Sequence, residues 1–169
     1  VSLFLFSLVG RANSTIDSLK TKLQNQKDDT LKVITCLSLA DELLIVDHDQ
    51  AEEYLQSALS LALNANSEKF IGLTYKQMGA HYFALSEYKF AMENLLLSEA
   101  YFKKINLTVE LCYVNNWMGR VYIRTGLEYE ALAKFENAVK LFKEIGDTIS
   151  AKEANLNIGA VYHELEYFG

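Results

Sequence analysis

The sequence predicts an all-α protein built from a repeated pair of helices, and three observations carry this prediction. The 169 residues include no proline, so long helices can run without the gap that its missing N–H would cause. Small and large apolar residues recur at intervals of about 40 residues. Asn66, Asn106 and Gly146 are evenly spaced with the same period. Asn and Gly tolerate the left-handed turn that ends many helices, so an independent class of residue supports the repeat.

Composition narrows the class of protein further. Half of the residues are hydrophobic, which predicts a folded chain with a substantial core rather than a disordered one. The formal net charge is −6, and no cluster of lysine and arginine stands out. Nucleic acids need such a basic surface, so they are excluded as a general partner.

The only cysteines are Cys36 and Cys112. No Cys-x-x-Cys is present and no histidine stands at ligand spacing to either cysteine, so we predict no zinc site. They fall in different repeats, and helices pack about 8–10 Å apart, which exceeds the reach of a disulfide. We therefore expect two buried free thiols.

The chain begins with the apolar run Val1–Gly10, which is too short to span a bilayer because a spanning helix needs about 20 residues. Two interpretations remain open. Residues 1–12 resemble the end of a secretory signal peptide, with small residues at Gly10 and Ala12 before a cleavage position, and with no initiator Met the chain then starts within a longer protein. Alternatively, Val1–Val9 forms a short helix or strand on the first repeat. We favour the signal remnant, which would place the protein in the periplasm or outside the cell; otherwise it is cytoplasmic.

The array itself is expected over residues 13–169. Ile16, Leu19 and Leu23 form an apolar stripe at helical spacing, which predicts an amphipathic capping helix over 14–26. The first repeat spans about 29–65, with a turn at 47–49. Its two helices align with those of the second repeat at offsets that differ by one residue, so this turn must absorb the difference. The second and third repeats span about 67–105 and 107–145, and a partial repeat spans 147–169.

The third repeat shows the pattern most clearly. Counting Asn115 as position 4, positions 7, 8, 11, 15, 20, 24 and 27 are Met118, Gly119, Tyr122, Gly126, Ala131, Phe135 and Ala138. This pattern resembles the tetratricopeptide repeat, a helix–turn–helix unit with small residues where its helices cross. Gly79, Gly119 and Gly159 share position 8, where a close crossing explains a residue that otherwise weakens a helix. The resemblance implies a right-handed superhelical solenoid of antiparallel helix pairs, with the first helices lining its concave side.

No catalytic constellation is present in the sequence, and we predict neither enzymatic activity nor a cofactor or metal. The motifs of zinc proteases, phosphate-binding loops and nucleophile elbows are all missing. His48, His81 and His163 fall far apart in the repeats, and we interpret each as a residue of the surface or of the edge of the core.

The resemblance also suggests where a ligand binds, because first-helix side chains on the concave side commonly contact ligands in this family. Carried over residue by residue, it implies the candidate ligand-binding residues Lys76, Gln77, Phe83, Tyr113, Asn116, Trp117, Arg120, Arg124, Asn157 and His163.

Within this set, Asn116, Arg120 and Arg124 are four residues apart and form one stripe. Arginine suits carboxylates, an asparagine amide can pair with a peptide backbone, and Trp117 offers a stacking surface. The members of this family that clamp C-terminal carboxylates use a lysine followed four residues later by an asparagine. Here Lys76 is followed by Ala80 at that position, so this type of clamp is not supported. The alternative is that the arginines pair with Glu128, Glu130 or Glu164 and that Trp117 belongs to the core.

These observations favour a scaffold that binds a protein or peptide and has no direct membrane contact through its repeats. Such an array resembles the N-terminal region of bacterial sensor kinases and regulators, which implies the sensing part of a larger signalling protein. The alternatives are a cytosolic peptide-binding regulator, similar to pheromone receptors, and a plain assembly scaffold. The unfinished last repeat exposes an apolar patch through which this chain could dimerise.

Overall fold

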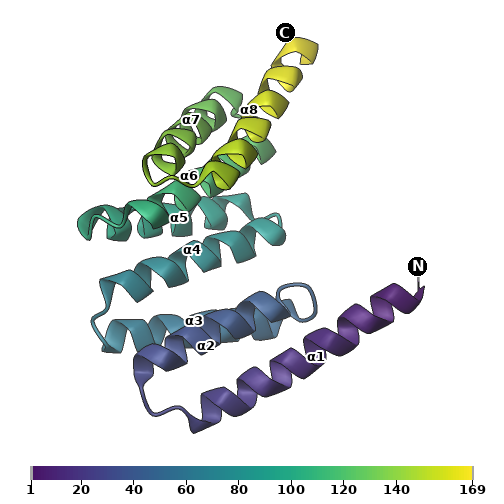
Figure 1. Ribbon diagram of the computed structural model, residues 1–169, viewed down its shortest axis with the longest axis vertical. Helices are drawn as coiled ribbons and strands as arrows, with labels where there is room; N and C mark the ends of the chain where they lie inside the picture. The colour runs from purple at the N-terminus through teal and green to yellow at the C-terminus, as the bar shows by residue number, and fades with distance from the viewer. Residues whose placement is uncertain (1, 169) are drawn as a thin grey trace. The chain divides into compact units, whose positions relative to one another are not determined.

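The computed structural model describes the backbone of residues 2–168 and the side chains of residues 14–166. The all-α prediction is confirmed, since no strand occurs among these residues (Figure 1). The chain divides into two compact units, Val1–Gln77 and Met78–Gly169, with the division inside α4. The helices are α1 (Ser2–Asn25), α2 (Asp29–Leu43), α3 (His48–Asn64), α4 (Glu68–Ala84), α5 (Tyr88–Lys104), α6 (Thr108–Arg124), α7 (Glu128–Glu144) and α8 (Thr148–Phe168).

In the first unit, α1 packs on α2 and α2 packs on α3. Ile16 is buried with Leu39, Leu43 and Ala51, and the rest of the apolar stripe of α1 packs against this cluster. The predicted capping helix is thus the C-terminal part of a longer helix. The backbone of residues 2–12 is helical and belongs to α1, which excludes a strand there. The packing of these side chains lies outside the described residues, and the signal remnant stays a prediction. Among the described residues, no helix is both long and apolar enough to cross a membrane.

Five of the turns between helices share one geometry and are evenly spaced along the chain. One residue in each has a positive φ, between 50° and 79°, and the N–H of the next residue donates to the carbonyl five positions earlier at 2.9–3.0 Å. This is the Schellman motif, which satisfies the last carbonyls of a helix. The residues with positive φ are Asn66, Ser86, Asn106, Gly126 and Gly146.

The turn between α2 and α3 differs from the others. It has four residues, 44–47, where the others have three. Asp47 ends it by accepting a hydrogen bond from the N–H of Gln50 at 3.0 Å, which caps α3. Although this turn is one residue longer, α2 has 15 residues where α4 has 17, so the first repeat is one residue shorter than the second over its first helix and turn.

In the second unit, α5, α6, α7 and α8 pack on one another in chain order. Phe135, which is fully buried, lies with Ala131, Leu132 and Val161 in one core cluster. A second cluster joins Cys112 of α6, Phe142 of α7 and Ala154 of α8, among others. Each helix therefore buries one face against its neighbour, as a helix of a stacked repeat must.

The cysteines are both free and buried, as predicted. Burial raises the pKa of the Cys112 thiol to about 11, so it is not a reactive thiolate at neutral pH. The expectation for His81 is wrong, because only 2% of its surface is exposed and its ring meets Tyr82 edge-on at 5.5 Å between centroids. His81 therefore belongs to the core.

Candidate functional site

Three aromatic and two arginine side chains gather at one place in the second unit, and we call them the aromatic–arginine cluster. Phe83 lies near the C-terminal end of α4, and Tyr88 is the first residue of α5. Trp117, Arg120 and Arg124 lie on α6 at intervals of three and four residues, which places them on one face of that helix. All but the exposed Arg124 are half-buried.

Arg120 is held between two aromatic rings. Its Cζ atom lies 4.0 Å from the centroid of the Trp117 ring and 4.8 Å from that of Phe83. The two rings meet edge-on at 5.5 Å between centroids. Burial lowers the pKa of the guanidinium, but the electron-rich ring faces attract the cation, and an arginine remains charged at neutral pH.

Arg124 is oriented by Tyr88. Its Nε donates a hydrogen bond to the Tyr88 hydroxyl at 3.0 Å, and its Cζ lies 5.9 Å from the centroid of that ring. Tyr88 in turn packs on Phe83, with 5.7 Å between ring centroids. Hydrogen bonds from Ser86 and from Arg124 lower the pKa of the Tyr88 hydroxyl. The second arginine is therefore joined to the first through the aromatic rings.

Neither arginine forms an ion pair with a carboxylate among the described residues. The predicted alternative, pairing with Glu128, Glu130 or Glu164, is thus not observed. Elsewhere in the same unit cations do form ion pairs, since Lys103 and Lys134 both pair with Glu99, at 3.0 Å and 3.1 Å. Within the described part of this acidic chain, both arginine charges therefore stand without a counterion.

The other sequence-predicted residues of the second unit have different surroundings. Asn157 of α8 donates from Nδ2 to Oδ1 of Asn116 at 3.3 Å, which links the first helices of two repeats. Tyr113 packs on Phe142 and donates to the Asp147 carboxylate at 3.3 Å, so it stabilises the core and the start of α8. His163 is exposed on α8.

Lys76 and Gln77 lie in the first unit and are not members of the cluster. Gln77 donates from Nε2 to the Leu37 carbonyl at 2.8 Å and also hydrogen-bonds the Asp41 carboxylate. Lys76 lies near enough to Asp41 to interact with its charge. Both side chains therefore help to hold α4 on α2.

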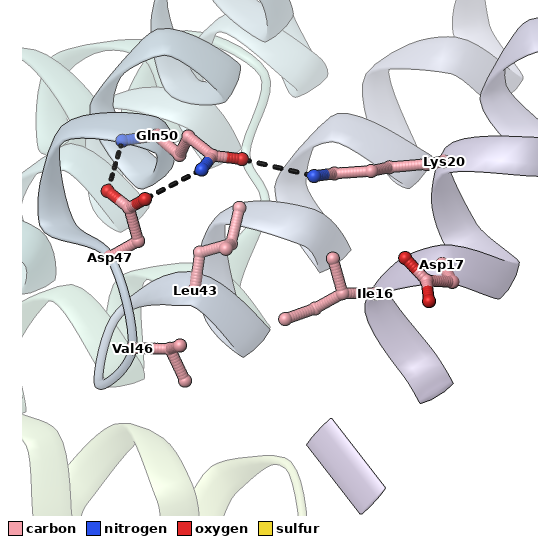
Figure 2. Close-up of a pocket in the computed structure, with 7 residues that line it drawn as sticks. All are labelled: Ile16, Asp17, Lys20, Leu43, Val46, Asp47 and Gln50. Atoms are coloured by element: carbon pink, nitrogen blue, oxygen red, sulfur yellow. Dashed lines mark hydrogen bonds between the residues drawn. The ribbon is translucent and has the colours of Figure 1, made fainter. Parts of the chain in front are cut away.

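A separate pocket of about 370 Å³ lies in the first unit (Figure 2). Helix α1 lines one side of it, and the end of α2, the following turn and the start of α3 line the other. Its wall combines apolar, charged and amide side chains, namely Ile16, Asp17, Lys20, Leu43, Val46, Asp47 and Gln50. No group of His, Cys, Asp and Glu suited to a metal ion occurs in the part of the chain that the structure describes.

Comparison with known proteins identifies the fold. The chain is similar to BtubC (BKLC) from P. vanneervenii, with 15% identity, a TM-score of 0.77 and coverage of 95% of this chain and 66% of that one. It is similar to a STAND signal-transduction ATPase with a tetratricopeptide-repeat sensor from Pyrococcus horikoshii (18%, TM-score 0.80, coverage 94% and 25%). It also resembles kinesin light chain-like repeats from Podosopora anserina (13%, TM-score 0.73, coverage 94% and 81%).

No protein-family model matches the chain, and no curated protein matches it. The chain spans just under two thirds of the first of these structures and a quarter of the second. At such low sequence identities these likenesses show the fold alone. The chain thus has the all-α fold of a tetratricopeptide-repeat solenoid.

Proposed function

We propose that this chain is a non-catalytic scaffold that binds a protein or peptide segment through the aromatic–arginine cluster and the neighbouring Asn116. The observation that carries the proposal is the cation of Arg120, which is half-buried on two rings and has no acidic partner among the described residues. A partner that supplies a carboxylate would complete this arrangement with a charge-assisted hydrogen bond.

The geometry of the cluster also lowers the cost of binding. A free arginine loses rotamer entropy when a ligand immobilises it, but Arg120 and Arg124 are already held by Trp117, Phe83 and Tyr88. Tryptophan, tyrosine and arginine are the residues that most often dominate binding energy at protein interfaces. The cluster therefore has the composition and the preorganisation of an interaction hot spot.

The amide pair extends this surface along α6 and α8. The contact between Asn157 and Asn116 uses one donor of the first residue and one lone pair of the second. Their remaining donors and acceptors can pair with the backbone of a bound segment. We therefore place Asn116 and Asn157 beside the cluster in the proposed binding surface.

We also propose that the chain is the sensing or regulatory region of a larger signalling protein. The similar protein from Pyrococcus horikoshii, whose repeats are described as a sensor, supports this role by analogy of fold. A cytosolic peptide-binding regulator and a plain assembly scaffold are the alternatives. The domains encoded beside these repeats in the gene distinguish the candidate roles. A membrane span with a kinase core favours the sensor, and a DNA-binding domain favours the regulator.

Charge reversal tests the binding surface. A partner is captured with the wild-type chain, purified, and titrated against the wild type and Arg120→Glu/Arg124→Glu. We expect the variant to bind at least about 30-fold more weakly, since hot-spot substitutions cost about 2 kcal/mol or more. Trp117 is the only tryptophan, so its fluorescence reports directly on this surface.

The matched control is Lys140→Glu/Lys143→Glu, which makes the same change in net charge on exposed positions of α7. It should bind the partner as the wild type does. Equal affinity of the wild type and the arginine variant, with both folded by circular dichroism, would contradict the proposed surface.

A further inference from the structure

The pocket of Figure 2 lies in the first unit, and three of the residues that line it are aliphatic. Ile16 of α1 and Leu43 of α2 are buried, and Val46 in the following turn covers one edge with about half of its surface exposed. A volume of about 370 Å³ falls in the range of about 300–1,000 Å³ that is usual for small-molecule sites. The pocket therefore has room for a small molecule with an aliphatic group.

The polar side of the pocket is a chain of hydrogen bonds. Asp47 accepts from the N–H of Gln50 at 3.0 Å and from its Nε2 at 2.6 Å, so Gln50 turns its Oε1 away. That oxygen accepts from Nζ of Lys20 at 3.1 Å (Figure 2). These bonds from Gln50, and to a smaller extent the charge of the nearby Lys20, hold the pKa of Asp47 low, so Asp47 is an anion that caps α3.

Lys20 and Asp17 are left incompletely paired by this arrangement. They are three residues apart on α1, a spacing at which opposite charges usually meet. Here the lysine reaches across to Gln50 instead, and within the described residues no ion pair joins it to Asp17. An ammonium group has three donors, and this contact uses one of them. The rim of the pocket therefore presents a cation with spare donors and, one turn away, an anion.

A positive group, a negative group and a set of aliphatic side chains match the carboxylate, the ammonium and the side chain of an aliphatic amino acid. We propose that this pocket binds a small aliphatic amino acid. Its carboxylate would meet the Lys20 ammonium, its ammonium would meet the Asp17 carboxylate, and its side chain would lie on Ile16, Leu43 and Val46. Because one wall is α1 and the other is α2–α3, the bound molecule would fasten α1 to the rest of the first unit.

Titration with L-leucine tests this proposal. Isothermal calorimetry and thermal melts should show saturable binding with a dissociation constant of about 1 mM or tighter, and a melting temperature that rises with ligand concentration. Two analogues each remove one charge: 4-methylpentanoate lacks the amine, and 3-methylbutylamine lacks the carboxylate. We expect each to bind at least tenfold more weakly than leucine. Equal binding of either analogue, or no saturable binding of leucine, would overturn the proposal.

Variants locate the site. Lys20→Met keeps the apolar stem and removes the ammonium, and Asp17→Asn removes the negative charge; each should weaken leucine binding at least tenfold. Val46→Phe changes no charge and fills the pocket from an exposed position, so it should also abolish binding while the protein stays folded. Lys22→Met is the matched control on the exposed side of α1 and should bind normally. Unchanged affinity in all three pocket variants would contradict the assignment. These ligands do not involve the aromatic–arginine cluster, so the charge-reversal result there is independent.

Discussion

Gly119 of α6 and Gly159 of α8 occupy the same position of the repeat, but their surroundings are opposite. A Cβ atom added to Gly119 would lie 2.7 Å from Cε1 of Phe135, and one added to Gly79, a repeat earlier, would lie 2.7 Å from Cγ of Leu95. A Cβ atom on Gly159 would meet nothing within 4 Å. In the first two cases a second helix packs closely on the glycine, and among the described residues no helix does so at Gly159.

This difference shows that one sequence signal can have two energetic meanings. At Gly119 the missing side chain permits a close helix crossing, and that benefit outweighs the poor helix propensity of glycine. At Gly159 only the poor propensity remains in the structure. The exposed Leu156 and Tyr162, at 74% and 51%, lie on the same open side of α8. Of the two residues expected in the dimerisation patch, Tyr162 is exposed and Ile158 packs against the core clusters, and dimerisation itself stays a prediction.

The largest expected effect comes from filling the closed crossing. Gly119→Leu places a branched side chain against the buried Phe135 ring and should lower the free energy of unfolding by about 3 kcal/mol or more. Urea unfolding monitored by circular dichroism measures the change. The same substitution at Gly159 is the control and should not destabilise the protein, because open space surrounds that position. A transition midpoint for Gly119→Leu equal to that of the wild type would break the comparison.

A smaller effect separates backbone conformation from packing. Gly126 has a φ of 71°, and a Cβ atom there would meet nothing within 4 Å. Gly126→Ala should therefore cost about 1 kcal/mol, entirely because an L-residue disfavours the left-handed region. Gly126→Asn should recover part of this loss, since asparagine tolerates that region. The expectation fails if the Gly126→Ala variant is as stable as the wild type in the same urea experiment.

The fold could be predicted from the sequence because its signal is repeated. Asn66, Asn106 and Gly146 all end helices with a positive φ, as their residue types indicate. Ser86 has the same conformation, which its residue type does not predict, since serine carries no preference for it. Ser86 adopts this conformation because its turn has the same hydrogen-bonded geometry as the turns before and after it.

The candidate site could be predicted only in part. Helical spacing alone places Trp117, Arg120 and Arg124 on one face, and the structure adds that Phe83 and Tyr88 hold the two arginines. Tyr88 begins a second helix, where the family pattern names no ligand contact, and its bond to Arg124 spans 36 residues.

The pocket in the first unit, with Lys20 turned toward Gln50, depends on how α1 packs on α2 and α3. No local pattern of residues encodes that packing geometry. The first helices of the repeats, where the family pattern places ligand contacts, therefore carry no signal for this site.

The most direct test of the repeat account is the sign of one substitution at two equivalent positions. Gly119→Ala and Gly159→Ala are compared with the wild type by equilibrium urea unfolding. We expect Gly119→Ala to lose about 1–3 kcal/mol because the methyl group meets a rigid ring. We expect Gly159→Ala to gain about 0.5–1 kcal/mol because alanine is the better helix former and nothing obstructs it. Changes of the same sign at both positions would contradict the account.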